Sequence, residues 1–595
     1  MCRIAGIVSS SLLPSRDAEL RAMLSVLVHG GPDDEGRYSD DRVTFGHRRL
    51  SIIDLSSAGH QPMVSSSSEL VISFNGEIYN YKSLREELAV LGATFATATD
   101  TEVILKAYEQ WGVKSFQRLT GIFAFSLYDK ANQKLFLVRD QAGVKPLYYN
   151  LSRQQLIFAS EVRAFKAFDN AWKENADWKI FFLAFGSIPF PYTTLDEVYQ
   201  LEPGCFLELN LADFSSAITA YRAAAGTSTP SSPGEELKNV GASIQRAVEK
   251  NLISDAPLGV LLSGGIDSSL LTLLADRQQE GIKTISINFD DAAFDEYPYQ
   301  RLVLEKTKHV EHTSHRITER MFWDNLDDIW KAMDQPTIDG VNTYFVSKCA
   351  RRDGLKVVLS GLGADEIFGG YASFRRIGLL KLLRTYLPFK NRVAKIIGFR
   401  KHKYRRLMFL DLPGPIGDYL FLRGIHTPNV IGALLDIPEA DVWEVLKKVQ
   451  VRLPENLEAH QYVSILESKI YMANQLLKDT DGMGMWHGLE IRVPFLDVEL
   501  VQHVEGISPE LRFREEGQKY LLTASHPKLI PPAIVNRVKK GFTFPIAMWM
   551  KNNPERFRSL TDSNNPAARK IIDGFTDGSD HWSKYWSLAV LRQFR

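Results

Sequence analysis

V-L-L-S-G-G-I-D-S-S-L-L (residues 260–271) is the most informative stretch of this sequence. An apolar run enters a serine–glycine loop, and a run compatible with a helix follows, which is typical of a strand–turn–helix unit. Backbone N–H groups at the start of such a helix attract phosphate, and the two glycines let a ligand approach the backbone. The loop is no Walker-type P-loop, because its lysine and its spacing are missing. We therefore predict a phosphate-binding unit.

A second loop of the same kind lies further along the chain. The apolar run K-V-V-L leads into S-G-L-G-A-D-E-I-F-G-G (residues 360–370). Around the two loops we predict strands at 258–262, 284–289 and 356–359, and helices at 235–251, 268–275, 299–308 and 343–352. This alternation predicts an α/β domain with a parallel sheet, in which both loops lie at the carboxyl ends of strands. Beyond residue 375 the pattern is mostly helical.

The first 210 residues are β-rich instead. Apolar runs predict strands at 3–8, 42–46, 70–74, 122–128 and 135–140, and helices are predicted at 17–28 and 101–110, the latter capped by Asp100. A small, polar, proline-containing run at 223–234 is typical of a linker. The expected organisation is a first domain at 2–210, a linker at 211–234, a second domain at 235–560 and a C-terminal tail at 561–595.

Composition narrows the range of functions. The chain has 595 residues, and its 71 basic and 71 acidic side chains cancel, so no overall charge draws it to nucleic acid. Its three cysteines are too few for a disulfide framework and favour a reducing, cytoplasmic location. The longest apolar run, I-F-F-L-A-F-G-S-I-P-F (residues 180–190), is shorter than the ~20 residues that span a bilayer. A secretory signal is not expected either.

A cysteine follows the initiator methionine in M-C-R-I-A-G (residues 1–6). We expect the methionine to be removed, which leaves Cys2 beside a free α-amine. That amine titrates near about 7.7–8.0 and can take the thiol proton, so the pair can act as nucleophile and base. The motif alone also fits an incidental cysteine.

Other residues of the first domain suit an α-amino acid ligand. In F-N-G-E-I-Y-N, the Asn75 side chain and the Gly76 backbone N–H can hold an oxyanion, and Glu77 can bind an ammonium group. Arg49 can bind a carboxylate bidentately, and Asp100 is a second ammonium partner. Taken singly, these residues also fit hairpin turns, a helix cap and surface charges.

Six motifs follow one another along this domain: M-C-R-I-A-G, G-P-D-D-E-G, R-L-S-I-I-D, F-N-G-E-I-Y-N, D-T-E-V and R-D-Q-A-G-V-K-P-L-Y-Y. They resemble the glutaminase domain of the asparagine synthetase family. The resemblance implies an α+β N-terminal-nucleophile sandwich in which Cys2 attacks the glutamine amide, and ammonia leaves through a thioester. It implies catalytic roles for Cys2, Asn75 and Gly76, and a glutamine site made of Arg49, Leu50, Ser51, Ile52, Ile53, Asn75, Gly76, Glu77 and Asp100.

One position departs from that pattern. The family reads H-R-G-P-D where this chain reads H-G-G-P-D (residues 29–33), so Gly30 replaces an arginine. We expect the loss of this cation to weaken glutamine binding or the closing of a loop.

The loop S-G-G-I-D-S-S resembles that of the ATP pyrophosphatases, which cleave ATP between the α and β phosphates. The resemblance implies ATP contacts at Leu262, Ser263, Gly264, Gly265, Asp267, Ser268, Ser269, Ile287, Ser360 and Gly361. It places Mg²⁺ on Asp267 and Asp365, which fits the preference of Mg²⁺ for one or two carboxylates plus phosphate oxygens. V-K-K-G-F (residues 538–542) resembles a family segment whose lysine, Lys539 here, stabilises charge on the phosphates. A solvated basic turn is the alternative.

The implied reaction has two halves. An acceptor carboxylate attacks the α-phosphate of MgATP to give an acyl-adenylate, and ammonia passed internally from the Cys2 site then displaces AMP. Aspartate is the expected acceptor. Family members, however, carry a glutamate in the second loop where this chain has Leu362, which can neither pair with an ammonium group nor relay a proton. Amidation of another carboxylate, such as a sugar uronic acid, is therefore the alternative.

Other interpretations stay open at this point. A non-catalytic binding protein is disfavoured by the intact Cys2, Asp267 and Asp365, and a ligase that closes an internal amide without glutamine is disfavoured by the intact Cys2. The basic stretch at 375–406 could meet an anionic acceptor or a membrane surface, although such runs are usually solvated faces. The sequence also leaves a homodimer open.

Overall fold

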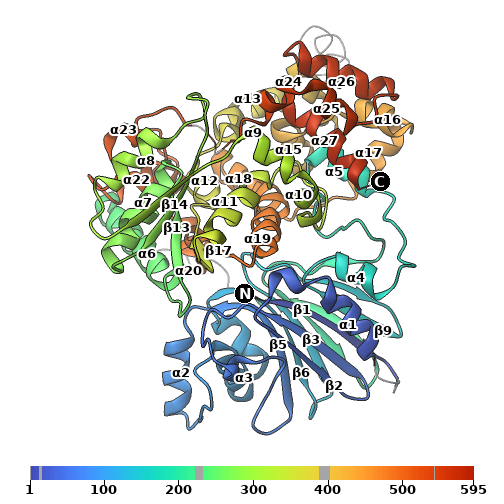
Figure 1. Cartoon of the computed structure of the whole chain (residues 1–595), viewed down its shortest axis with the longest axis vertical. Helices are drawn as coiled ribbons and strands as arrows, with labels where there is room; N and C mark the ends of the chain where they lie inside the picture. Colours follow the sequence, from blue (N-terminus) through green and yellow to red (C-terminus); the bar gives the residue numbers. More distant parts are fainter. Residues whose placement is uncertain are drawn as a thin grey trace.

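The computed structural model describes residues 2–11, 16–221, 232–386, 402–539, 541 and 543–594. Figure 1 shows a lower, blue part built on β-strands and an upper part, green to red, in which helices dominate. Among the described residues, no helix is both long and apolar enough to cross a bilayer.

Two antiparallel sheets form the first domain. One has the strand order β10 (Tyr199–Gln200), β8 (Tyr148–Leu151), β9 (Gln155–Ala159), β1 (Arg3–Ser9), β3 (Val43–Arg49) and β2 (Asp34–Ser39). The other has the order β12 (Ser216–Ala220), β11 (Cys205–Asn210), β7 (Lys134–Arg139), β6 (Gly121–Asp129), β5 (Leu70–Ile78) and β4 (Met63–Val64).

Alternation along these strands builds a four-layer sandwich. Ile4 and Phe45 of one sheet pack with Val71 and Leu137 of the other in the central core. On the outer faces, α1 (Asp17–Ser25) and α4 (Arg163–Phe168) cover the first sheet, and α2 (Tyr81–Val90) and α3 (Asp100–Trp111) cover the second. The predicted α+β N-terminal-nucleophile sandwich is confirmed. Asp100 is not the cap of α3, because the Thr99 side chain accepts the capping hydrogen bond.

A five-stranded parallel sheet forms the centre of the second domain. Its order is β15 (Glu311–Arg316), β14 (Lys283–Asn288), β13 (Leu258–Leu261), β16 (Val357–Leu359) and β17 (Glu490–Arg492). Because side chains alternate, Val357 and Leu359 enter one core, and Val358 enters the other. The helices of the sheet region include α6 (Pro233–Asn251), α7 (Ile266–Gln278), α8 (Tyr297–Leu304), α11 (Val341–Arg352), α12 (Ala364–Phe368), α19 (Leu477–Trp486), α20 (Val498–Glu505), α22 (Tyr520–Ala524) and α23 (Pro532–Val535).

The predicted helical part of the second domain is confirmed. It includes α9 (Glu319–Asp324), α10 (Leu326–Ala332), α13 (Ala372–Tyr386), α15 (Pro415–Arg423), α16 (Pro428–Leu435), α17 (Glu439–Lys447), α18 (Ala459–Leu466), α24 (Ile546–Asn552), α25 (Pro554–Ser559), α26 (Pro566–Thr576) and α27 (Trp582–Gln593). The predicted tail at 561–595 is therefore wrong for the described residues 561–594, since α26 and α27 pack into the core and Trp586 is fully buried. Of the basic stretch at 375–406, residues 387–401 lie outside the described residues.

The domain boundaries also differ from the prediction at 210 and 234. β12 pairs with β11 inside the expected linker, because sheet pairing continues to Ala220. α6 begins at Pro233 with Ser232 as its cap, and residues 222–231 lie outside the described residues.

A helix of the first domain belongs to the core of the second. α5 (Trp178–Phe185) is apolar apart from Lys179 and packs with α15, α16 and α17, where Phe185 stacks on Tyr419 with ring centroids 5.8 Å apart. Figure 1 shows α5 in teal among the orange and red helices, away from the blue sheets. The first domain is thus not a separable unit at 2–210.

Candidate active site

Cys2 lies at the start of β1, buried beside the end of β5. Its backbone nitrogen donates to Asn75 Oδ1 at 3.1 Å, whereas the fully buried Asn75 Nδ2 has no partner among the described residues. Burial raises the pKa of the Cys2 thiol, although a backbone hydrogen bond at Leu50 and the charge of Arg49 oppose this. A buried thiol next to an unused amide donor is what acyl transfer with oxyanion stabilisation requires.

The end of β5 and the start of α3 bring buried carboxylates together. Glu77 Oε2 has no hydrogen-bond partner among the described residues, although Arg492 Nη2 lies 3.9 Å away, and burial together with Glu490 and Asp100 raises the pKa of Glu77 well above its usual range. Asp100 accepts from the Ile78 backbone at 3.0 Å, and burial raises its pKa to about 6. These two predicted ammonium partners therefore face one region, to which Glu490 of the second domain adds a third carboxylate.

The predicted glutamine loop after β3 bridges the two domains. Arg49 donates to the carbonyls of Ser56 at 2.7 Å and Asp54 at 2.5 Å, so its guanidinium supports the end of this loop. Leu50, Ile52 and Ile53 are buried, and Ser51 N donates to Asp33 Oδ2 at 2.8 Å. Asp33 in turn accepts from Lys356 Nζ at 2.6 Å, next to β16.

The two glycine-rich loops of the second domain meet across one cavity of about 530 Å³. A Cβ at Gly361 would lie 2.7 Å from Asp267 Cβ, so glycine is what lets the loops approach. Most predicted ATP contacts line this cavity: Leu262, Ser263, Gly265, Asp267, Ser268, Ile287, Ser360 and Gly361. Gly264 lies in the same turn with a φ of 79°, and Ser269 is fully buried behind it.

The two predicted metal ligands converge on one point. Lys519 Nζ lies 2.6 Å from both carboxylate oxygens of Asp267 and 2.6 Å from Asp365 Oδ1, and Lys539 also contacts Asp365. Burial raises the pKa of Asp267, while the two lysines outweigh burial at Asp365 and lower its pKa to about 2. Carboxylates that share one ammonium group can also share Mg²⁺, so the residues present fit this ion.

Lys519 contacts both aspartates of the candidate site, and the sequence did not predict it. No motif surrounds it, and its φ of 49° places it in the left-handed region that non-glycine residues rarely adopt. Such backbone strain gathers at functional sites. The topology alone brings Lys519 to the two loops.

The remainder of the cavity carries residues from distant segments. Leu362 lines it as predicted, together with Phe185 of α5 and Tyr471 of a π-helical segment (Glu467–Leu476). Asp339 and Asp479 add two carboxylates, and burial raises the pKa of both. Asp479 accepts from Thr337 Oγ1 at 2.8 Å. No sequence signal marked these acids, because Asp339 lies in the loop before α11 and Asp479 lies on α19, far apart in the sequence.

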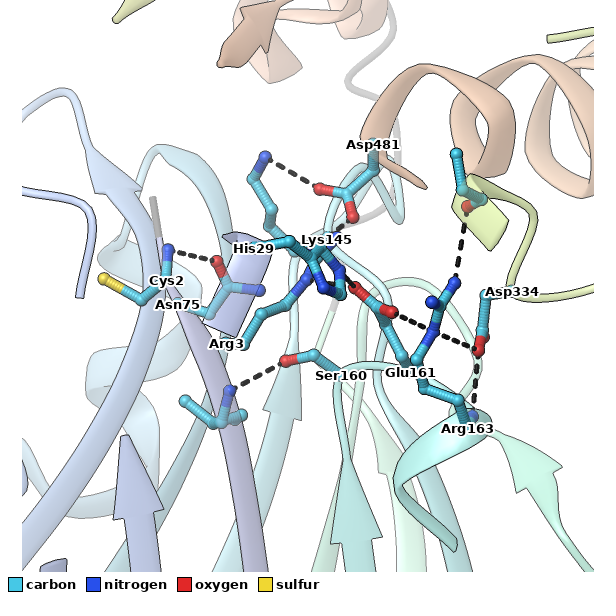
Figure 2. A network of polar contacts seen from close by, with 12 residues as sticks. Cys2, Arg3, His29, Asn75, Lys145, Ser160, Glu161, Arg163, Asp334 and Asp481 are labelled. Atoms are coloured by element: carbon cyan, nitrogen blue, oxygen red, sulfur yellow. Dashed lines mark hydrogen bonds and ion pairs between the residues drawn. The ribbon is translucent and has the colours of Figure 1, made fainter. Parts of the chain in front are cut away.

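Buried ion pairs connect the two domains next to Cys2, through the following residue, Arg3 (Figure 2). Arg3 pairs with Glu161 at 2.6 Å and with Asp481 of α19 at 2.7 Å, and Lys145 lies 3.4 Å from the same aspartate. A second cavity of about 50 Å³ is lined by Arg3, Glu161 and Asp481, and also by Asp479, which lines the large cavity too. Asp479 therefore lines both cavities.

An N-terminal-nucleophile sandwich joined to a parallel nucleotide-binding sheet defines a class of protein, the glutamine amidotransferases that use ATP. The chain matches a glutamine amidotransferase domain over residues 1–221 and an asparagine synthase domain over residues 239–588. It belongs to the asparagine synthase family and is an enzyme that uses ATP to drive glutamine-dependent amidation.

Relatives cover nearly the whole chain. Asparagine synthetase 1 (glutamine-hydrolyzing) of Bacillus subtilis is 31% identical across 99% of this chain and 96% of that protein. Amidase chry2 of Gibberella zeae is 26% identical across 89% and 85%. Among solved structures, a glutamine phosphoribosylpyrophosphate amidotransferase from B. subtilis covers 53% of this chain and 81% of its own at 15% identity, with a TM-score of 0.30 that supports no conclusion.

Proposed function

We propose that this enzyme amidates aspartate to asparagine by forming an aspartyl-adenylate and letting ammonia from glutamine displace AMP. The observation that carries the proposal is the convergence of Asp267, Asp365, Lys519 and Lys539 in one cavity with the phosphate-binding loop. Mg²⁺, when bound by the two aspartates, would neutralise charge on the departing pyrophosphate. The lysines can hold the same phosphate oxygens.

In the first half-reaction we assign Cys2 as nucleophile and its α-amine as base. Asn75 Nδ2 and the Gly76 N–H would hold the oxyanion, and Arg49, Glu77 and Asp100 would bind the ends of glutamine. Gly76 supports this assignment, since its φ of 147° and the Ile122 carbonyl, 2.1 Å from a Cβ built there, admit only glycine. Ammonia would pass along the smaller cavity, because Asp479 lines both spaces.

We expect the pH profile of glutamine hydrolysis to report Asp100. A carboxylate binds an ammonium group only when deprotonated, and the Asp100 pKa is raised to about 6. The kcat/KM for glutamine should therefore rise as the pH passes through about 6 and level off above it. Asp100→Asn should lower kcat/KM and lose this limb. An unchanged limb in that variant would show that another group, such as Glu77, causes it.

The large cavity supports an acceptor that carries an ammonium group. Asp339 and Asp479 line it and form no ion pair among the described residues, and burial raises the pKa of both, with the charge of Lys478 opposing this at Asp479. The α-ammonium of aspartate can compensate these buried charges and replace the contact that Leu362 cannot make. A uronic acid carries no cation and would leave both acids unpaired.

Succinate provides the matched test, because it is aspartate without the amine. We expect saturable AMP formation with aspartate, at least about tenfold weaker turnover with succinate, and none with glucuronate. Asp479→Asn should raise the KM for aspartate by about 10–100-fold. Equal turnover of succinate and aspartate would refute the ammonium site, and preferential turnover of glucuronate would refute aspartate as the acceptor.

A cytoplasmic location also stays a proposal, supported by three cysteines that are all unpaired.

A further inference from the structure

We propose that Arg3 and Asp481 are positioning residues that fix Cys2 for glutamine hydrolysis, so that the first half-reaction depends on a carboxylate of the second domain. The inference rests on the proposed role of Cys2. It gives a role to the buried ion pairs around Arg3, which take no direct part in the proposed chemistry of either site (Figure 2).

Arg3 is the residue next to the nucleophile, and its side chain is fully buried. Nε lies 2.6 Å from Glu161 Oε1, and Nη1 lies 2.7 Å from Asp481 Oδ2. Asp481 belongs to α19, and its other oxygen lies 3.4 Å from Lys145 Nζ. A buried arginine held between two carboxylates keeps its charge, and its planar fork fixes the direction of the side chain. The start of β1 is therefore tied to α19.

Gly30 provides the space for this arrangement. A Cβ at Gly30 would lie 2.6 Å from Arg3 Cγ and 2.8 Å from Arg3 Nε, which are closer than any real contact. This chain has glycine at position 30 instead of the expected arginine, and the side-chain stem of Arg3 occupies the space that a Cβ at position 30 would need. The chain therefore lacks the cation of the family motif at position 30 and carries one at Arg3, the residue next to Cys2.

Cys2 gains support from this tie because it precedes the first strand. Its backbone nitrogen donates to Asn75 Oδ1 and its thiol has a backbone hydrogen bond at Leu50, so the position of the start of β1 decides whether both contacts stay aligned. The same Asn75 is the proposed oxyanion donor, so a small shift of Cys2 would misalign thiol and donor together. Reaction rates fall steeply when a reacting group moves by about 1 Å. Loosening the Arg3–Asp481 pair should therefore slow the reaction more than it weakens glutamine binding.

Glutamate release from glutamine by the full chain tests this inference without an acceptor. We expect Arg3→Met and Asp481→Asn each to lower kcat by at least about tenfold and to change the KM for glutamine by less than about threefold. Arg3→Lys, which keeps the charge, should recover part of the loss. Arg163→Gln is the matched control. Arg163 also joins the domains, through Glu161 at 2.7 Å and Asp334 at 3.4 Å, but it does not contact Asp481.

The outcomes separate cleanly. If Asp481→Asn hydrolyses glutamine like the unaltered chain, or if Arg3→Met loses no more activity than Arg163→Gln, the inference is wrong. A parallel rise in KM and fall in kcat, with no recovery by Arg3→Lys, would indicate a merely structural role and also overturn it. Absence of glutamate release from the unaltered chain would instead refute the proposed function of Cys2.

Discussion

Asp267→Asn should abolish AMP formation with either glutamine or ammonia as the nitrogen source. The substitution keeps the shape of the side chain but removes one of the two carboxylates that converge on Lys519. Without that charge, the two-carboxylate site proposed for Mg²⁺ would lose one of its residues, and the ammonium group of Lys519 would be left with Asp365 alone. We expect turnover to fall by about 10³-fold, as when one electrostatic contact to a transition state is removed.

The measurement is AMP release with saturating ammonia, which bypasses the first domain. Asp276→Asn is the matched control, since Asp276 lies on the same helix and binds the backbone nitrogens of Lys308 and His309, outside the cavity. It should retain adenylation. A near-normal rate of AMP release by the Asp267→Asn variant would refute the proposed metal and phosphate site.

Cys2→Ala should eliminate glutamine-dependent amidation and preserve the ammonia-dependent reaction. If Cys2 is the nucleophile, as proposed, its removal leaves no route to the thioester, so glutamate release should fall by about 10³-fold or more. The large cavity contains no residue of β1, and ammonia-dependent turnover should stay within about twofold. Both activities are measured on the same sample, so the second activity shows that the variant is folded.

Cys205→Ala is the control for this change. Cys205 is also buried in the first domain, at the start of β11 on the other sheet. It should leave both reactions intact. Full glutamine-dependent activity in Cys2→Ala would disprove the nucleophile assignment.

The fold was predictable where apolar runs and turns coincide. β13, β14 and β16 stand within a residue or so of their predicted ranges, because each is a short apolar run before a turn. β15 was missed because E-H-T-S-H-R is polar, as befits an edge strand with mostly accessible side chains. β17 was missed because it is only E-I-R, whose two charges are buried against each other.

The residues of the site also fall into two groups, those that a local motif predicts and those that only the fold brings together. Asp267, Asp365 and Lys539 stand in local motifs, and the structure brings all three to one cavity. Lys519 and Asp479 lie in no motif, and only the folded chain places them there. The apolar character of residues 180–190 likewise predicts that they are buried, but it does not predict in which domain.

α5 has a consequence for how the chain is made. α15, α16 and α17, which pack on it, leave the ribosome up to roughly 260 residues later, which takes on the order of 13–52 s at about 5–20 residues per second. Throughout that time the apolar side chains of α5 lack these three helices to pack on, while the sandwich can already close. Newly made chains therefore depend on protection from one another until α17 emerges, and a message that stops short of it yields a product prone to aggregation.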